Sequence, residues 1–291
     1  MTGPALPSPL VSTQWLADYL GSDSLVVLDA TVLPFATPTG KSGFLSGHEQ
    51  YLVNGHIPTA LFADLIEAFS DTEASLPFTH QAPAAFAVAA GALGIDNETT
   101  VVVYDSSVGQ WAARLWWLFR AAGYDRVAVL DGGYTKWLAE GRQTDVGHLE
   151  PTPTTFVAGE RPELWATKSD IEDVLAGTAT AALVCGLPPK EFSGEEGSRV
   201  RRGHIPGSIS APAGRLVDRE TNALLPESDL RETFGPALDQ PRIVTYCAAG
   251  IAASADALAL TILGQKNVAI YDGSLLEWTA DDRLPVATLA R

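Results

Sequence analysis

A cysteine at the end of a predicted strand is the residue best suited to chemistry. Cys247 directly follows Ile243–Tyr246, a β-branched and aromatic run of the kind that forms buried strands. The alanine-rich stretch after Gly250 predicts a helix that ends near Gly264. We expect a thiol at this junction to face unpaired backbone N–H groups, which favour an anion and would stabilise a negatively charged sulfur. The alternative is a small apolar residue that fills the end of a strand.

Composition limits the classes of function. The 291 residues carry a net charge of −16, which argues against nucleic acid and anionic membranes as partners. No apolar stretch is long enough to span a membrane, and the N-terminus lacks the features of a signal peptide, so we expect a cytoplasmic protein. Two cysteines cannot form a disulfide framework or a cysteine-rich metal site, and we expect no metal.

Strand-like and helix-like segments alternate along the chain. Residues 25–29, 101–105 and 127–130 have the apolar pattern of buried strands, and residues 84–93 that of a helix. Residues 34–55 are loop-like, with proline, glycine and threonine. The alternation predicts an α/β fold, with parallel strands joined by crossover helices.

The chain also repeats itself. Four matches recur in the same order at offsets of 148, 142, 141 and 141 residues, which indicates two copies of one α/β domain. The matching pairs are Gly55–Pro58 with Gly203–Pro206, Val101–Asp105 with Ile243–Cys247, Asp131–Gly132 with Asp272–Gly273, and Trp137 with Trp278.

We therefore predict an N-terminal domain over residues 1–146, a linker over 147–162 and a C-terminal domain over 163–291. Where the second copy has Cys247, the first has Asp105. A carboxylate cannot act as a sulfur nucleophile, so we expect the first domain to be catalytically inactive. It would then lend a wall to a cleft between the domains.

These residues resemble the tandem-domain rhodanese-type sulfurtransferases, the family of thiosulfate and 3-mercaptopyruvate sulfurtransferases. The resemblance covers nearly the whole chain and implies two tandem rhodanese-like domains, each a five-stranded parallel sheet flanked by helices. The motifs that carry it are Gly-His-Ile-Pro in both halves, residues 113–120 and 129–137 in the first half, and residues 246–251 and 268–278 in the second.

The resemblance also implies a mechanism. Cys247 would attack the outer sulfur of a small anionic donor, become a persulfide, and pass that sulfur to cyanide or to a thiol. Such a double displacement needs no metal and no organic cofactor, and we expect a monomer or a weak homodimer. The loop that would cradle the persulfide consists of Ala248, Ala249, Gly250, Ile251 and Ala252.

The residues after the cysteine depart from the family pattern. Thiosulfate-specific members carry basic residues there and mercaptopyruvate-specific members carry Gly and then Ser or Thr, whereas this chain has Ala248 and Ala249. The serine of the proton relay in mercaptopyruvate enzymes is thus missing. Asp64 fits its aspartate partner, but the histidine position is Phe78, with His80 two residues away. We therefore favour thiosulfate as the donor, with 3-mercaptopyruvate as the alternative.

A second departure concerns the group that grips the donor. The family has Asp-Ala-Arg at residues 185–187, and the arginine binds the anionic end of the donor. Leu187 cannot do this. Arg199, Arg201 and Arg202 precede the second Gly-His-Ile-Pro motif, so one of them would substitute. The alternative is that they are solvated loop charges.

Other residues have two interpretations each. Cys185 ends a strand expected beside that of Cys247, so it is either a redox partner of Cys247 or a residue that fills a strand end. Trp111 either forms an apolar wall of the substrate pocket or packs in the core. His56 and His204 recur in both copies, including the one without the cysteine, and we therefore expect them to structure turns rather than act as bases.

Two other functions compete with sulfur transfer. Cysteine-based phosphate hydrolysis requires an arginine after five intervening residues, and Ala253 stands at that position. A rhodanese-like binding or regulatory module with little turnover is the stronger alternative, because the donor-gripping arginine is absent.

Overall fold

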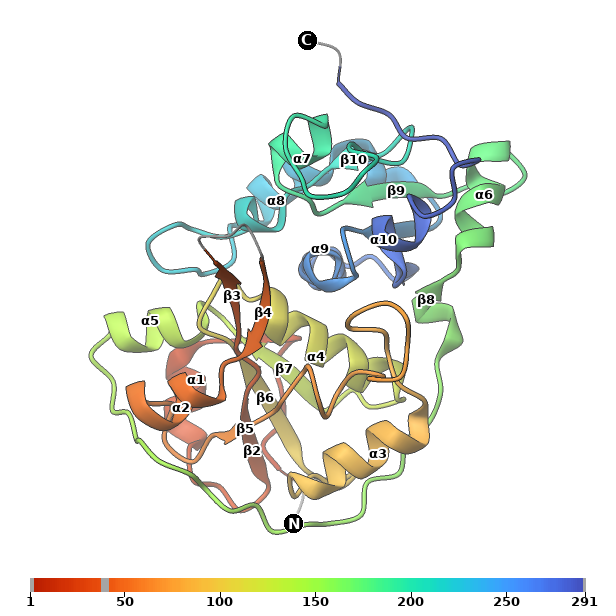
Figure 1. Ribbon diagram of the computed structural model, residues 1–291. Helices are drawn as coiled ribbons and strands as arrows, with labels where there is room; N and C mark the ends of the chain where they lie inside the picture. Colours follow the sequence, from red (N-terminus) through yellow and green to blue (C-terminus); the bar gives the residue numbers. More distant parts are fainter. Residues whose placement is uncertain (1–2, 38–41, 290–291) are drawn as a thin grey trace. The chain divides into compact units, whose positions relative to one another are not determined.

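The computed structural model describes residues 3–37 and 42–289. The chain forms two compact units, each of which takes in a short segment from the other half of the sequence (Figure 1). The first unit consists of Met1–Glu73, His80–Glu160 and Arg219–Ala223, and the second of Ala74–Thr79, Arg161–Asp218 and Leu224–Arg291.

The first unit is built on a parallel five-stranded sheet with the order β1-β7-β6-β2-β5. Its strands are β1 (Leu10–Val11), β2 (Leu25–Asp29), β5 (Leu61–Phe62), β6 (Thr100–Tyr104) and β7 (Val127–Leu130). Its helices are α1 (Thr13–Tyr19), α2 (His48–Asn54), α3 (Pro83–Ala92), α4 (Gln110–Ala121) and α5 (Gly133–Ala139).

The second unit repeats this topology, with a parallel sheet of order β10-β9-β11-β12-β8. Its strands are β8 (Trp165–Ala166), β9 (Ala182–Cys185), β10 (Ile209–Ser210), β11 (Ile243–Tyr246) and β12 (Val268–Tyr271). Its helices are α6 (Lys168–Ala176), α7 (Pro189–Ser193), α8 (Glu227–Phe234), α9 (Ile251–Ile262) and α10 (Ser274–Trp278), with short 3-10 turns at η1 (Pro162–Leu164), η2 (Ala213–Arg215) and η3 (Gly235–Asp239).

The predicted fold class is confirmed. Every residue of the central strands β6 and β11 is buried, as expected of parallel strands covered by helices on both faces. Because β6 and β11 occupy the same place in their sheets, Asp105 and Cys247 follow equivalent strand ends. The helix predicted over 84–93 is α3, displaced by one residue.

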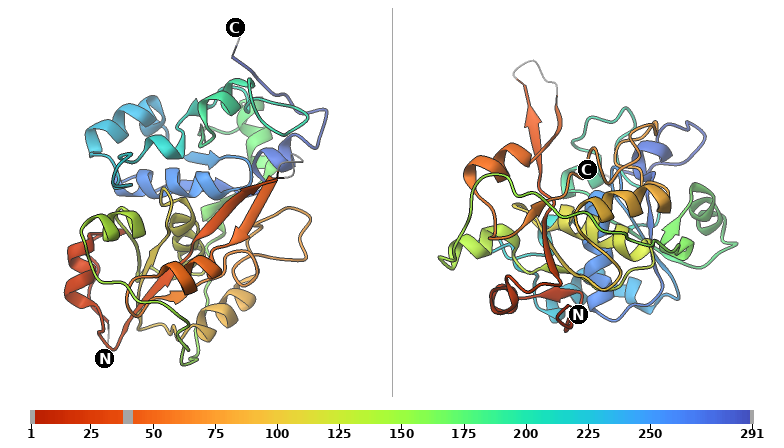
Figure 2. Two further views of the ribbon diagram at one scale, coloured as in Figure 1. Left: turned by 60° about the vertical axis from the view of Figure 1, so that its left-hand side comes forward. Right: turned by 90° about the horizontal axis from the view of Figure 1, so that it is seen from below.

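The prediction of a loop over residues 34–55 was wrong for the described part of that range, and residues 38–41 lie outside the described residues. An antiparallel hairpin, β3 (Val32–Ala36) and β4 (Ser42–Ser46), lies outside the five-stranded sheet, and α2 follows it (Figure 2). The hairpin strands contain Pro34 and Gly43, residues that weaken a strand pattern. The two strands form because they pair with each other, and local composition does not predict this pairing.

The Gly-His-Ile-Pro motif has the same structural role in both units. The N–H of Ile57 donates to the hydroxyl of Tyr104 at 3.2 Å, and the N–H of Ile205 donates to Tyr246 at 3.0 Å. His56 is buried among backbone carbonyl partners, and the Nδ1 of His204 pairs with a carbonyl at 2.8 Å. The expected role of these histidines in structuring turns is confirmed.

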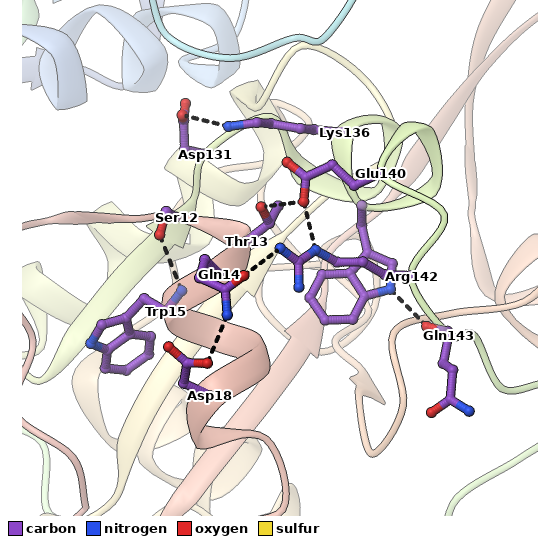
Figure 3. Close-up of polar contacts among 11 residues, drawn as sticks. Ser12, Thr13, Gln14, Trp15, Asp18, Asp131, Lys136, Glu140, Arg142 and Gln143 are labelled. Carbon is purple, nitrogen blue, oxygen red and sulfur yellow. Dashed lines mark hydrogen bonds and ion pairs between the residues drawn. The ribbon is translucent and has the colours of Figure 1, made fainter.

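The α1 helix is fixed at both its cap and its first turn (Figure 3). Ser12 accepts a hydrogen bond from the N–H of Trp15 at 3.1 Å, as an N-cap does. The Thr13 hydroxyl donates to Glu140 at 2.7 Å, and Arg142 pairs with the same carboxylate at 2.6 Å. This cluster ties α1 to the end of α5.

The segment between the sheets packs on the first unit. The N–H groups of Thr154 and Gly159 donate to the carbonyls of Gly91 and Ala122, at 2.8 and 2.7 Å. Phe156 is buried in an aromatic cluster with Phe86, Phe119 and Tyr124. Residues 147–160 therefore pack as part of the first unit.

Within residues 3–37 and 42–289, no helix has the length and apolar character needed to cross a bilayer.

Candidate active site

Cys247 lies immediately beyond the last residue of β11, at the carboxyl edge of the second sheet. It is a free thiol with 3% of its surface exposed. The next residues turn sharply into α9, and Gly250 makes this turn in the left-handed region with φ of 80°. A glycine adopts this conformation without the penalty that a Cβ would bring. The cysteine therefore sits between a buried strand and the start of a twelve-residue helix.

Ser274 holds the loop that carries the cysteine. Its fully buried hydroxyl accepts hydrogen bonds from the N–H groups of Cys247 and Gly250, both at 3.1 Å, and donates to the carbonyl of Tyr271 at 2.8 Å. The next N–H, that of Leu275, donates to the carbonyl of Cys247 at 3.1 Å. The start of α10 thus fixes both ends of the loop.

Sequence reasoning missed Ser274. A signal was present, because the repeat places Ser274 opposite Gly133, directly after the shared Asp-Gly pair. The two positions adopt similar backbone conformations, with φ of 48° and 53°. A serine is strained where a glycine is comfortable, and the second copy nevertheless has the serine.

The matching loop of the first unit contains an anion of its own. The buried carboxylate of Asp105 accepts hydrogen bonds from the N–H groups of Ser107, Gly109, Trp111 and Ala112, at 2.8, 3.1, 2.9 and 2.9 Å. Two of these donors are the second and third residues of α4. The N–H groups of this loop and of the first helical turn converge on a negative charge at the strand end.

In the second unit, two residues, Cys247 and Ser274, stand in for Asp105: one carries the reactive atom and the other binds the loop. The N–H of Gly109 donates to the Asp105 carboxylate, whereas that of its counterpart Gly250 donates to the Ser274 hydroxyl. The second and third residues of α9 are Ala252 and Ala253, whose N–H groups have no partner one turn earlier in the helix. These two residues stand where Trp111 and Ala112, which donate to Asp105, stand in the first unit, so their N–H groups are suited to stabilise a thiolate or a persulfide on Cys247.

The comparisons with known proteins agree with this geometry. The family model for the rhodanese-like domain matches residues 12–140 and 187–281. The chain is 35% identical to the 3-mercaptopyruvate sulfurtransferase of Escherichia coli strain K12, over 95% of this chain and 96% of that protein. This chain belongs to the rhodanese family of sulfurtransferases. Its predicted family and its class as a sulfurtransferase enzyme are thereby confirmed.

Other members of the family point the same way. The chain is 35% identical to the thiosulfate sulfurtransferase of Cricetulus griseus, over 92% of this chain and 91% of that one. The crystal structure of the 3-mercaptopyruvate sulfotransferase SseA from Escherichia coli matches with a TM-score of 0.79 and 32% identity, over 92% of this chain and 98% of that one. Relatives with either donor in their names thus match this sulfurtransferase over nearly its whole length.

Cys185 ends β9 directly beside β11, opposite Tyr246 in the register. It is a free, fully buried thiol, and burial raises its pKa to about 12. Little thiolate forms at neutral pH with such a pKa, which favours the strand-filling interpretation. Its role as a redox partner of Cys247 stays a prediction. In the first unit, the equivalent end of β2 carries Asp29 opposite Tyr104, so the strand ends bear two carboxyls in one unit and two thiols in the other.

The candidate arginines have different surroundings. The guanidinium of Arg201 donates to the backbone carbonyls of Asp281 and Leu284, and exposed Arg202 donates to a loop carbonyl at 3.4 Å. The side chain of Arg199 is 7% exposed and pairs through Nη1 with Glu191 at 3.3 Å. Within the described residues, its buried Nε and Nη2 have no hydrogen-bond partner.

Asp64 and Trp111 lie in the first unit. The Asp64 carboxylate accepts from the Ser46 hydroxyl at 2.8 Å and from two N–H groups of its own turn, so it organises that turn. Trp111 is buried at the start of α4 and packs edge-on against Phe44, with ring centroids 5.3 Å apart. The core interpretation of Trp111 is therefore supported, and the contact of either residue with substrate stays a prediction.

A buried acid also lies in α9 of the second unit. Asp256 is fully buried, and neither carboxyl oxygen has a hydrogen-bond partner among the described residues. Burial raises its pKa well above the ordinary range. Its Oδ2 lies 2.7 Å from the place where a Cβ on Gly186 would stand, so the glycine makes room for it.

Across the described ranges, no cluster of three metal-ligating side chains occurs.

Proposed function

We propose that Cys247 accepts a sulfur atom from a small anionic donor and passes it to a thiol or to cyanide. The observation that carries this proposal is the Asp105 carboxylate, which accepts four backbone N–H bonds in the matching loop of the first unit. A persulfide on Cys247 bears a negative charge at the equivalent strand end. The corresponding N–H groups, apart from that of Gly250, which donates to Ser274, would stabilise this charge as they do in the first unit.

The reaction has two displacements. The Cys247 thiolate attacks the outer sulfur of the donor, a new S–S bond forms, and the bond between that sulfur and the rest of the donor breaks. With thiosulfate, the electron pair leaves with sulfite. The acceptor then attacks the outer sulfur of the persulfide, and Cys247 returns to the thiolate.

Thiosulfate is the favoured donor and 3-mercaptopyruvate the alternative. The sulfite leaving group needs no proton, and Ala249 next to Gly250 offers no hydroxyl to transfer one. Relatives named for each donor share about a third of their residues with this chain, so overall identity does not separate the two.

Arg199 is the candidate for binding the anionic end of the donor. Its Nε and Nη2 form one edge of the guanidinium, the geometry that binds a carboxylate or sulfonate through two parallel hydrogen bonds. Glu191, its ion-pair partner, lies on α7, which begins four residues after β9 ends at the sheet edge that also carries Cys247. A buried, unpaired guanidinium edge is costly unless a ligand occupies it.

The test is direct loading of the protein with sulfur. Intact-protein mass spectrometry after incubation with thiosulfate or with 3-mercaptopyruvate is expected to show a gain of one sulfur atom, which peptide mapping places on Cys247. The Cys247→Ser variant should show no gain, and Cys185→Ser should load like the wild type. The faster of the two donors identifies the substrate.

Failure of both donors to load Cys247 would replace this proposal with a rhodanese-like binding or regulatory module. For the sulfurtransferase we further propose a cytoplasmic location and a monomer or weak homodimer. The first rests on two thiols that are both free, and cell fractionation and analytical ultracentrifugation would test the two statements.

A further inference from the structure

One short segment from the N-terminal half of the sequence belongs to the second unit. It consists of Ala74–Thr79 and contains Phe78. Phe78 has φ of 60°, in the left-handed region that glycine and asparagine adopt and that a bulky aromatic residue avoids. The side chain is 9% exposed. A buried ring is thus held in a strained backbone conformation on a segment that packs with the unit of Cys247.

A matching segment belongs to the first unit. It consists of Arg219–Ala223 and contains Asn222, with φ of 56°. Phe78 and Asn222 are 144 residues apart, between the offset of 148 for His56 and His204 before them and the offset of 142 for the strand ends after them. The same conformation in the same order indicates that the two segments occupy equivalent places in the repeat.

The copy in the first unit reveals what such a segment contacts. The Asn222 amide donates to the carbonyl of Ser107 at 2.7 Å and to the hydroxyl of Thr135 at 3.1 Å. Ser107 belongs to the loop that surrounds the Asp105 carboxylate. The segment therefore lies on the loop that holds the anion, and its left-handed residue makes the contact.

We propose that Phe78 occupies the equivalent place in the second unit, where its ring covers the Ala248–Ala249 loop of Cys247 and determines which donors react. This rests on the proposed function of Cys247 as the sulfur acceptor. Ala248 and Ala249 are half-buried and have methyl side chains, a surface that fits an aromatic ring. Asn222 makes its contacts through an amide group, whereas the side chain of Phe78 is an apolar ring.

An apolar cover favours one class of donor. Transfer from thiosulfate joins the Cys247 thiolate to the outer sulfur and releases sulfite with the bonding electron pair, so no proton moves. Transfer from 3-mercaptopyruvate breaks a carbon–sulfur bond, and the thiol proton of the donor must reach the carbon that becomes the methyl group of pyruvate. Phe78 and Ala249 carry no group that moves a proton, and the ring keeps water from the persulfide.

The backbone strain is a second observation in favour of a role for Phe78. A residue held in an unfavourable conformation persists where the surrounding structure or the function requires its side chain. Asparagine at this position would relax the backbone, as Asn222 does in the first unit. Phe78→Asn therefore removes the ring and relaxes the backbone together, whereas Phe78→Leu keeps an apolar side chain and the strain, so the two variants together separate the side chain from the strain.

The experiment compares Phe78→Asn, Phe78→Leu and the wild type, with Asn222→Ala as the matched control in the first unit. Each protein is loaded with thiosulfate and freed of excess donor, and intact mass then follows the lifetime of the persulfide. The kcat/KM values for thiosulfate and 3-mercaptopyruvate are measured in parallel, together with Tm.

Phe78→Asn is expected to shorten the persulfide lifetime and to shift the ratio of the two kcat/KM values toward 3-mercaptopyruvate by roughly tenfold. Phe78→Leu keeps an apolar cover and should fall between the two, and Asn222→Ala should keep the wild-type lifetime and ratio. Wild-type lifetime and donor ratio in a folded Phe78→Asn protein would overturn the inference while leaving sulfur loading intact. A wild type that loads no sulfur would instead overturn the proposed function itself.

Discussion

Removal of the Ser274 hydroxyl is expected to weaken the second unit and slow sulfur transfer together. The hydroxyl accepts from the N–H groups of Cys247 and Gly250 and is fully buried. Without it, two buried donors lose their partner, and each such loss costs about 1–3 kcal/mol. Partial relaxation of the loop reduces the sum, so we expect the free energy of unfolding to fall by about 3 kcal/mol.

The variant to use is Ser274→Gly. Glycine stands at the equivalent position in the first unit and accepts φ near 50° without strain, so the substitution removes the hydroxyl without adding a backbone penalty. The control is Ser254→Ala, which removes another fully buried hydroxyl of the same unit. Its single bond, to the carbonyl of Gly250 at 2.9 Å, leaves the two loop donors paired. We expect it to cost about 1 kcal/mol.

Two assays test the reasoning. Urea denaturation reports the change in unfolding free energy, and rapid-quench mass analysis reports the single-turnover rate of sulfur loading on Cys247. A loop that moves by about an ångström loses catalytic geometry, so we expect loading by Ser274→Gly to slow by roughly 100-fold. The idea is wrong if Ser274→Gly loads sulfur at the wild-type rate and unfolds at the same urea concentration.

Three further results are expected. Burial raises the pKa of Asp29 to about 6, so its folded state retains a proton that the unfolded state releases; unfolding free energy should fall by about 3 kcal/mol as pH rises from about 3 to 7, and Asp29→Asn should abolish that fall in urea titrations. Arg199→Lys keeps the charge without the planar edge, so KM for thiosulfate should rise roughly tenfold with little change in kcat; an unchanged KM would remove Arg199 from the donor site. Cys185 should resist iodoacetamide at pH 8 in the folded protein while Cys247 reacts, and equal labelling of both thiols by peptide mapping would contradict the buried, protonated state of Cys185.

The sequence alone predicted the features that follow from apolar runs and from the internal repeat. The repeated motifs identified two α/β domains, and the buried pattern of the central strands placed Cys247 and Asp105 at equivalent ends. Burial of Trp116, Trp117 and Trp278 also agreed with their assignment to the core. These predictions succeeded because a strand buried on both faces requires continuous apolar residues, and a repeat displays its own alignment.

The features that the sequence did not predict depend on pairing between distant segments. The β3–β4 hairpin contains Pro34 and Gly43, which weaken a strand pattern, and it forms because its two halves pair with each other. The contact between Ser274 and the Cys247 loop joins positions 27 residues apart. The exchange of the segments that carry Phe78 and Asn222 depends on the packing of the whole chain. Local composition does not predict such contacts, although each of these features is visible as a difference between the two copies.

Under the proposed function, the two copies explain how one architecture yields a structural site in the first unit and a reactive site in the second. In the first unit, a single carboxylate, that of Asp105, supplies the negative charge and satisfies the loop, including the N–H of Gly109. In the second unit, Ser274 satisfies Gly250 and the backbone of the cysteine itself, so the Cys247 sulfur need not bond the loop to keep it in place. A nucleophile must leave its resting contacts to attack a donor. Because the hydroxyl maintains the loop, the sulfur can gain or lose an atom while the cradle stays assembled.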